Sequence, residues 1–281
     1  MITTRLFGGL GNQLFQYAAG RALADRLGTE LALDRRYVSA VPGRPDGLGH
    51  FRAARFTEAP LPPHKSKPLR YLAWRKFGRA PRFQRETALG FNPGFAAFGD
   101  STYLHGYWQS ERYFAPIAEA LRADLRFTTP LNDANMAMAE QITSAPALSL
   151  HVRRGDYVAL GPHNDVGLPY YAAALDHVLA KTKAQTKPHV FVFSNDPQWV
   201  AQNLPLPAAH TIVDINSEND GAFDLHLMSL CDHNIIANST FSWWAAWLNA
   251  NPDKTVVAPR QWFAPSARQN PDICPAGWTR L

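Results

Sequence analysis

The chain has 281 residues, of which 46% are hydrophobic and 18% charged, enough for one large domain or two smaller ones with buried cores. No apolar run approaches the roughly 20 residues that span a bilayer, and patterned structure starts almost at once, so we expect neither a membrane span nor a signal peptide. The two cysteines lie far apart without metal-ligand spacing, which favours a reducing, cytoplasmic location.

The net charge of +5 is unevenly spread along the chain. Residues 35–88 hold 13 Lys and Arg against three acidic residues, so the remainder has 15 basic and 20 acidic residues, a net of −5. This basic segment predicts an anionic partner, such as a membrane surface, a lipid-linked pyrophosphate glycan or nucleic acid. Membrane contact would make the protein peripheral at the inner membrane. The other interpretation is a solvated insertion.

The first elements form a unit with the order strand, turn, helix, strand. We expect a strand at 2–7, a glycine-rich loop at 8–12, a helix at 13–27 that stops at Gly28, and a strand at 30–34. Amides at a helix N-terminus bind phosphate, so this turn is a candidate site for a diphosphate or sugar, with Gly9, Gly11, Asn12 and Gln13 as its residues. A plain tight turn is the alternative for the individual glycines.

The same unit is typical of dinucleotide-binding domains, in which Asp34 would hold a ribose. The glycine fingerprint of those domains is incomplete here. Gly9 and Gly11 match the first two glycines of G-x-G-x-x-G, but Leu14 occupies the third position.

Residues 35–99 contain many prolines and no sustained periodicity, so we expect irregular structure there. A strand at 103–108, a helix from 109 to 125 and a proline-containing linker at 128–133 should follow. The linker predicts an N-terminal domain at 1–130 and a C-terminal domain at 131–281.

The second half alternates strands with helices. Strands are expected at 147–152, 189–193, 210–215, 235–238 and 255–258, and helices at 169–183, 222–231 and 242–249. A further helix should begin at Pro197, with Asp196 as its cap. This alternation predicts an α/β fold with a parallel, doubly wound sheet.

The stretch at 149–157 carries the strongest chemical signal. Its strand should be buried and should deliver, at the edge where open α/β sheets bind ligands, His151, Arg153, Arg154, Gly155 and Asp156. Arginine is always charged, and its planar fork fits phosphate oxygens. The alternative is a strand-end turn with solvated arginines, but the surrounding pattern favours a site.

Three blocks resemble the α-1,2-fucosyltransferases and, more loosely, the α-1,6- and protein O-fucosyltransferases. They are His-Val-Arg-Arg-Gly-Asp-Tyr at 151–157, Gly-Gly-Leu-Gly-Asn-Gln-Leu-Phe-Gln-Tyr-Ala at 8–18 and Ser-Thr-Phe-Ser-Trp-Trp at 239–244. The resemblance implies a bacterial GT-B glycosyltransferase, with two Rossmann-like lobes facing each other across a cleft. It would move L-fucose with inversion from GDP-β-L-fucose, held by the C-terminal lobe, to the 2-hydroxyl of a galactoside on the N-terminal lobe. Surface glycan or lipopolysaccharide synthesis is the implied context.

The resemblance also implies roles for donor-binding residues. Arg153 would face the β-phosphate, and Arg154 would support the loop or the diphosphate. Because the two arginines can take the place of a metal ion, we expect no metal or other cofactor. A second phosphate clamp would come from Asn238, Ser239 and Thr240, for which helix capping is the alternative. Asp224 would read guanine with His151, because a carboxylate accepts both N–H groups on one edge of the base. A surface acid is the alternative for Asp224.

The general base and the acceptor contacts are less defined. Asp156 lies in the motif, but neighbouring arginines would lower its pKa and make it a poor base, so His163 and Asp165 are alternatives. Trp108 and Gln109 are expected to contact the acceptor, because Gly-Tyr-Trp-Gln at 106–109 recurs in the family. A Tyr-Trp pair is more often part of a core.

Two other functional classes are compatible with parts of the sequence. One is a dinucleotide-dependent oxidoreductase, against which the incomplete glycine fingerprint argues. The other is a non-catalytic module that binds carbohydrate or nucleic acid, favoured only by the basic segment and the tryptophans.

Overall fold

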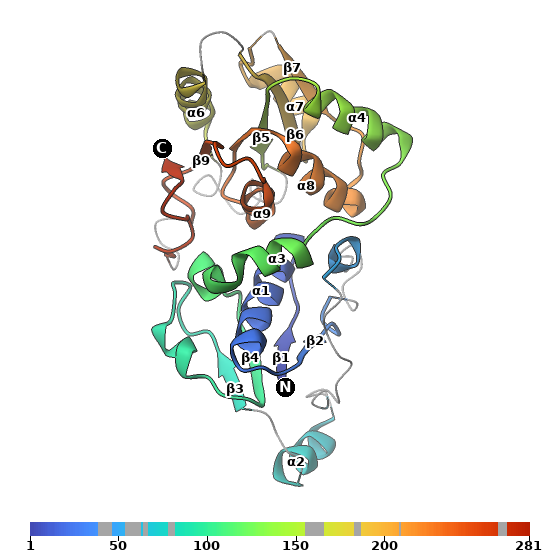
Figure 1. The fold of residues 1–281 in the computed structure, drawn as a ribbon, viewed down its shortest axis with the longest axis vertical. Helices are drawn as coiled ribbons and strands as arrows, with labels where there is room; N and C mark the ends of the chain where they lie inside the picture. Colours follow the sequence, from blue (N-terminus) through green and yellow to red (C-terminus); the bar gives the residue numbers. More distant parts are fainter. Residues whose placement is uncertain are drawn as a thin grey trace. The chain divides into compact units, whose positions relative to one another are not determined.

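The structure, a computed structural model, describes residues 1–38, 47–53, 63, 67–77, 82–154, 166–182, 187–207, 209–263 and 269–281. The chain divides into two compact units, Met1–Arg126 and Phe127–Leu281 (Figure 1). The boundary expected from the sequence lies at residue 130. Both units are α/β with parallel sheets, which confirms the predicted fold class.

The first unit contains a four-stranded sheet in the order β2-β1-β4-β3. Its strands are β1 (Ile2–Arg5), β2 (Leu31–Asp34), β3 (Arg82–Arg85) and β4 (Thr102–His105). Thr3 of β1 lies opposite Ala32 on one side and Tyr103 on the other. The chain thus leaves β1 in one direction and returns on its other side, which creates a topological switch point between β1 and β4.

The helix α1 (Leu10–Arg26) is buried on nearly all sides, including its polar residues Gln13, Gln16 and Arg21. Only a glycine at position 20 lets it lie this close to β1, because a Cβ there would collide with Thr4 Oγ1. Asp124 Oδ2 accepts from Tyr17 Oη at 3.2 Å and from Arg21 Nε at 3.0 Å, which ties α1 to α3 (Ala118–Asp124). Gly28, at φ 59°, ends the α1 region as expected.

Several elements of this unit differ from the sequence-based expectation. The supposedly irregular segment contains α2 (Pro68–Phe77) and β3, and short 3-10 turns at η1 (Gly47–His50) and η2 (Pro93–Ala97). The expected helix at 109–125 is instead divided into η3 (Glu111–Tyr113), η4 (Ala115–Ile117) and α3. Pro116 explains the break, because it has no N–H to continue a helix from Arg112.

The second unit contains a six-stranded parallel sheet in the order β10-β9-β8-β5-β6-β7. Its strands are β5 (Ala147–Val152), β6 (His189–Ser194), β7 (His210–Val213), β8 (His233–Ile235), β9 (Val256–Ala258) and β10 (Thr279–Arg280). Counted from β5, this is the 3-2-1-4-5-6 order of doubly wound nucleotide-binding sheets, with its switch point between β5 and β8. The sequence placed β8 two residues too late and did not indicate β10.

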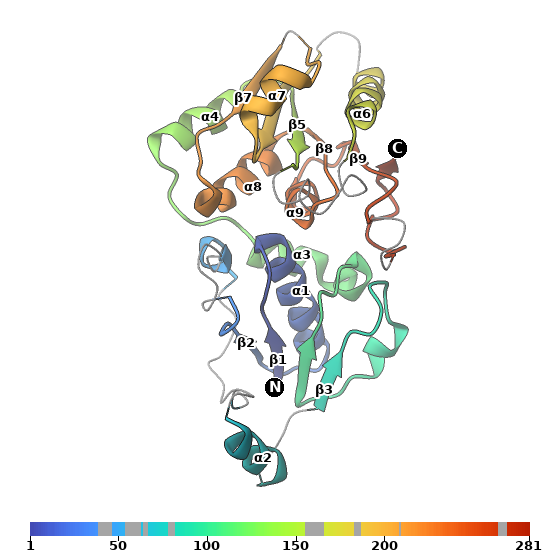
Figure 2. The same cartoon turned by 180° about the vertical axis from the view of Figure 1, so that it is seen from behind.

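The described residues of this unit contain the helices α4 (Asp133–Thr143), α6 (Leu168–Lys181), α7 (Pro197–Asn203), α8 (Gly221–Leu230) and α9 (Thr240–Leu248), with a 3-10 turn η5 (Glu218–Asp220). Asp196 caps α7 by accepting from the Trp199 backbone N at 3.1 Å, as predicted. The sequence had not indicated α4, which Asn132 caps. Helix α7 packs against β6 and β7, and Figure 2 shows it next to β7.

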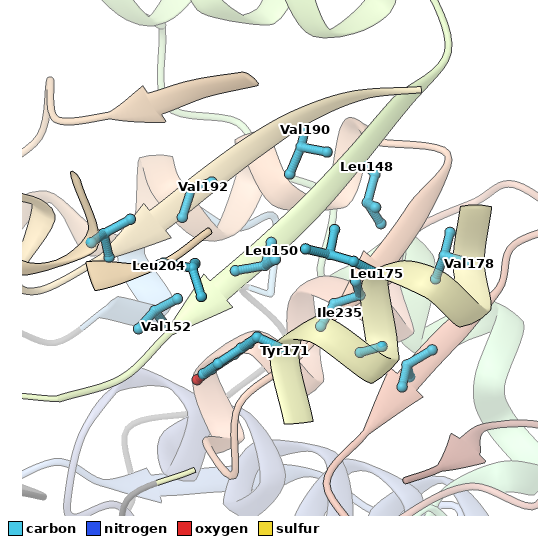
Figure 3. Close-up of a cluster of buried hydrophobic side chains, with 13 residues drawn as sticks. Leu148, Leu150, Val152, Tyr171, Leu175, Val178, Val190, Val192, Leu204 and Ile235 are labelled. Atoms are coloured by element: carbon cyan, nitrogen blue, oxygen red, sulfur yellow. The ribbon is translucent and has the colours of Figure 1, made fainter. Parts of the chain in front are cut away.

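The alternation of side chains along β5 separates a core face from a polar face. Leu148, Leu150 and Val152 pack in a buried cluster with Tyr171, Leu175 and Val178 of α6 (Figure 3). Ser149 and His151 lie on the other face, where Ser149 Oγ accepts from Asn234 Nδ2 at 2.7 Å. The strand therefore supplies the core on one side and polar groups on the other.

Candidate functional site

Three elements of the second unit meet at the carboxyl end of β5, beside the switch point. His151 Nδ1 lies 2.9 Å from Ser242 Oγ, and its ring lies 5.6 Å from that of Phe241 at the start of α9. A Cβ on Gly221, the first residue of α8, would lie 3.6 Å from the Phe241 ring. The end of β5 and the N-terminal ends of α8 and α9 are thus neighbours, as expected for a nucleotide-binding edge.

His151 is a neutral hydrogen-bonding group at this edge. Burial, together with the positive charge of Arg153, lowers the pKa of its imidazole to about 3. Its Nδ1 shares a hydrogen bond of 2.9 Å with Ser242 Oγ, which also lies 3.4 Å from Ser239 O, and the direction of the histidine bond depends on the tautomer. The ring is therefore neutral over the whole physiological pH range.

The N-terminus of α9 provides positive potential beside His151. Ser239 is the N-cap, and its Oγ accepts from Phe241 N at 3.3 Å. Asn238 Nδ2 donates to Trp262 O at 3.2 Å, which fixes the turn before the helix. Aligned peptide dipoles at a helix N-terminus favour an anion, so capping and phosphate binding can both occur here.

Arg154 holds the end of β5 against the start of α7. Its backbone N donates to Asn195 Oδ1 at 2.9 Å, and its guanidinium carbon lies 3.7 Å from the centroid of the Trp199 ring. Its Nε lies 3.8 Å from Asp196 Oδ2. These contacts anchor the chain after β5, and a contact of Arg154 with the diphosphate stays a prediction.

Asp224, in the first turn of α8, belongs to a polar relay that the sequence did not reveal. Its Oδ1 accepts from Asn216 Nδ2 at 2.7 Å, and Asn216 exchanges two hydrogen bonds with Asn135 of α4, at 2.8 and 3.0 Å. Burial raises the pKa of Asp224 to about 6; the Asn216 bond opposes this shift, and the charges of Asp220 and Asp214 add to it. A carboxylate with such a pKa is typical of functional sites. No local pattern could have linked asparagines from separate elements.

The glycine-rich turn of the first unit lies at the switch point between β1 and β4. The helix α1 begins at Leu10 with Gly9 as N-cap, earlier than expected. Asn12 Oδ1 accepts from Gln109 Nε2 at 2.8 Å, so the structure brings these two candidates together. Gln13 is buried and spans the turn, donating to Gly8 O at 3.1 Å and accepting from Gly47 N at 3.2 Å. Its contribution is therefore to the shape of the turn.

The two glycines at the start of this turn differ in what they require. Gly8 has φ 81°, and a Cβ there would lie 2.8 Å from Asn12 Nδ2. A Cβ on Gly9 would meet nothing within 4 Å. The tight-turn interpretation thus holds for Gly8, whereas space beside Gly9 is open to a ligand.

Trp108 takes the core position that was the alternative to an acceptor contact. Its side chain is 1% exposed and packs against the rings of Phe95, Phe98 and Tyr113. Its φ of 57° turns the chain sharply at this point. The ring is therefore out of reach of a sugar in this arrangement.

The structure argues against both rival functional classes. Asp34 is buried and its carboxylate is bound by Arg36 Nε at 2.8 Å, Arg36 Nη2 at 2.6 Å and Tyr103 Oη at 2.7 Å, so it is not presented to a ribose. Burial raises the pKa of Asp34, but the hydrogen bonds from Arg36 and Tyr103 outweigh it and the net shift is downward. The tryptophans at 243, 244 and 247 form core contacts within α9 and not a sugar-binding surface.

Part of the predicted site falls outside the described residues. Gly155 and the three candidate bases, Asp156, His163 and Asp165, belong to that part. Within the described ranges, no group of three or more His, Cys, Asp and Glu could hold a metal ion. None of the helices in those ranges is long and apolar enough to cross a bilayer.

Comparison with known proteins gives one matching family, two similar curated proteins and one similar solved structure. Residues 94–281 match the model of glycosyl transferase family 11. An α-1,2-colitosyltransferase from Escherichia coli is 31% identical, covering 100% of this chain and 99% of its own. The O-antigen biosynthesis glycosyltransferase WbnK, also from Escherichia coli, is 31% identical over 92% of this chain and 94% of its own.

A solved structure has a similar fold. The α-1,6-fucosyltransferase NodZ of Bradyrhizobium, in a crystal soaked with GDP-fucose, superposes with a TM-score of 0.53 at 16% identity. The match covers 88% of this chain and 91% of NodZ. The fold of this chain is therefore similar to that of a GT-B-type fucosyltransferase.

Proposed function

This chain belongs to glycosyl transferase family 11, and we propose that it moves L-fucose from GDP-β-L-fucose to the 2-hydroxyl of a galactoside, with inversion, forming an α-1,2 linkage. The observation that carries this proposal is the nucleotide-binding edge of the second unit. There a neutral histidine lies against a helix N-terminus at the switch point of the sheet, and the charge of Arg153 is close enough to lower the pKa of that histidine. The three sequence blocks that resemble α-1,2-fucosyltransferases include these residues and favour this donor and linkage.

In the proposed reaction, the diphosphate leaves with the electron pair of the bond to fucose C1. Arg153 and the N-terminus of α9, with Ser239 and Thr240, neutralise the charge that grows on the phosphate. Such stabilisation needs no metal, so we propose metal-independent transfer. The galactoside 2-hydroxyl forms the new bond to C1 from the opposite face and loses its proton to a base, for which Asp156, His163 and Asp165 remain the candidates.

Guanine recognition is proposed for Asp224 and His151. The Asp224 carboxylate, oriented by Asn216, accepts N–H groups of the base, and His151 Nε2 offers a second acceptor in the tautomer that carries the proton on Nδ1. Adenine presents a different donor pattern, so these acceptors would favour a guanosine nucleotide. Gly9, Gly11, Asn12 and Gln109 of the first unit are proposed to complete the donor and acceptor contacts.

The sugar itself has one serious competitor. Colitose is 3-deoxy-L-fucose, and the α-1,2-colitosyltransferase matches this chain over its whole length. A GDP-linked 3-deoxy sugar is therefore the second candidate donor. The distinction depends on whether the site satisfies the 3-hydroxyl, since an unpaired buried partner for that group would reject the deoxy sugar.

The relation to WbnK favours a role in surface glycan or lipopolysaccharide synthesis. We also propose peripheral contact with an anionic membrane or lipid-linked glycan through α2. Leu69 and Leu72, one turn apart, are 83% and 60% exposed, with Arg70 and Lys76 beside them. Exposed leucines flanked by basic residues are typical of helices that lie in a membrane interface.

The deciding experiment compares GDP-fucose and GDP-colitose as donors on a glycan array, followed by linkage analysis of the products. We expect fucose on terminal galactose, linked α-1,2, with activity retained in excess EDTA. If the protein transfers a sugar only from GDP-colitose, the proposed donor is wrong and the 3-deoxy analogue of fucose is the sugar that it moves. Loss of activity in EDTA that magnesium or manganese restores would contradict the arginine mechanism.

A further inference from the structure

We infer that Tyr107, together with Phe7, forms a stacking platform for the galactose ring of the acceptor, at the carboxyl edge of the sheet in the first unit. This inference rests on the proposed function, because it concerns the acceptor of that reaction. It replaces Trp108 by its neighbour as the aromatic residue that contacts sugar.

The conformation of the turn after β4 explains why Tyr107 is the outward residue. Glu86 accepts from the backbone N of Tyr107 at 2.7 Å and from that of Trp108 at 2.9 Å. Gly106 permits this approach, because a Cβ there would collide with Glu86. The positive φ of Trp108 then directs its ring into the core, while the adjacent Tyr107 remains 37% exposed between buried neighbours.

The surface around Tyr107 is aromatic and held in place from beneath. The Tyr107 and Phe7 rings lie 4.9 Å apart, and the His105 ring meets Phe7 edge-on at 5.8 Å. Gln16 fixes Phe7 with two bonds to its backbone, accepting from N at 2.9 Å and donating to O at 3.2 Å. A platform that is already ordered loses little entropy when it binds a ligand.

The position and chemistry of this surface fit a pyranose ring. Phe7 and Tyr107 follow β1 and β4, the two strands that flank the switch point, where open α/β sheets bind ligands. The C–H face of galactose is apolar and stacks on aromatic rings, while its hydroxyls require polar partners. The hydrogen-bonded pair of Asn12 and Gln109 lies at the same edge and belongs to the same turns.

The test uses N-acetyllactosamine as the acceptor probe and three variants. Tyr107→Ala should raise the acceptor KM by about 3- to 10-fold, with the KM for GDP-fucose unchanged. Tyr107→Phe, which keeps the ring, should retain the wild-type acceptor KM. Phe83→Ala is the matched control, since Phe83 is an exposed aromatic residue of the same sheet on the edge strand β3, and it should leave the acceptor KM unchanged.

A donor-free measurement separates this inference from the proposed function. Saturation-transfer NMR should detect N-acetyllactosamine on the wild-type protein and a weaker signal on Tyr107→Ala. If the protein binds the disaccharide through Tyr107 but transfers no fucose, the proposed function fails and the platform stands. If fucose is transferred and Tyr107→Ala alters neither the acceptor KM nor the NMR signal, the platform is wrong.

Discussion

Folding favours the protonated form of the Asp224 carboxyl, whereas the proposed recognition of guanine requires its charged form. Burial raises the pKa of its carboxyl to about 6, so the folded protein favours the protonated form more than the unfolded chain does. The resulting penalty is absent below pH 4, grows as the pH rises from 4 to 6, and is complete above pH 6. Guanine recognition, in contrast, requires the charged carboxylate that exists above pH 6.

Asp224→Asn should therefore stabilise the ligand-free protein and weaken its binding of GDP. At pH 7.5 we expect a gain in the free energy of unfolding on the order of 2 kcal/mol, which should vanish at pH 4. The affinity for GDP should fall roughly 10- to 100-fold at pH 7.5. Denaturant unfolding and calorimetry measure both quantities. Unchanged GDP affinity would show that Asp224 does not contact the nucleotide.

Asn216→Ala tests the orientation of Asp224 by a readout that a purely structural role would not change. Removing the Asn216 hydrogen bond should raise the pKa of Asp224 further, because that bond lowers it. GDP affinity should then be reduced at pH 7 and recover towards the wild-type value at pH 8.5. A deficit that is the same at both pH values would show that Asn216 acts only on the fold.

Arg153 and Arg154 are adjacent but should respond differently to substitution. Arg153→Ala should lower kcat by on the order of 100- to 1000-fold, since the lost charge matters most when the diphosphate departs. Arg153→Lys should restore little, because lysine lacks the bidentate fork. Arg154→Ala should lower Tm as well as activity, because it loses the contact with Trp199. Near-normal turnover in a folded Arg153→Ala enzyme would remove the centre of the proposed mechanism.

At the level of single elements, the turn from β1 into α1 offers a paired test. Gly8→Ala should cost about 1–2 kcal/mol of stability, because alanine is strained at φ 81° and would crowd Asn12. Gly9→Ala should change stability by less than about 1 kcal/mol, since its Cβ meets nothing. If a ligand approaches Gly9, this variant should still lose activity. Full activity in Gly9→Ala would exclude close approach there.

The elements that the sequence predicted well are those with a strong apolar pattern. The run at 147–152 gave β5 with its correct bounds, and Asp196 with Pro197 marked the start of α7. The strand β3 was missed because its exposed edge position leaves Arg82, Gln84 and Arg85 around one aromatic residue, without apolar alternation. The start of α1 was placed three residues late because glycines at its first turn suggested a loop.

The candidate site was predicted in kind but not in detail. Local motifs indicated His151, Arg153 and the cap at Ser239, because each follows directly from a strand or starts a helix. The partners of Asp224 come from segments distant in the chain, and the choice between Tyr107 and Trp108 depends on a backbone turn set by Glu86. Such relations arise only from tertiary packing, which a single sequence does not display.

At the scale of the whole molecule, α2 predicts a salt-dependent attraction to anionic membranes. Trp74 meets Phe83 of β3 at 6.1 Å, whereas Leu69 and Leu72 are exposed and form the outward side. Binding to liposomes should rise with phosphatidylglycerol content and weaken at high salt.

The double substitution Leu69→Ser and Leu72→Ser should abolish liposome binding without loss of transfer to a soluble acceptor. Met136→Ser, which changes an exposed apolar residue of the second unit, is the control. Liposome binding that changes neither with salt concentration nor with the leucine substitutions would contradict the proposal.

Each unit is one uninterrupted stretch of chain, and the described strands of each sheet all come from their own unit. During synthesis, the ribosome therefore releases every strand of the first sheet before the second begins to emerge, which lets the first unit fold early. Because each unit is continuous, Arg126–Phe127 is a suitable junction for joining a first unit from one relative to a second unit from another. Because acceptor and donor choice are proposed to reside in separate units, a single crossover there would pair one relative's acceptor with another's nucleotide sugar.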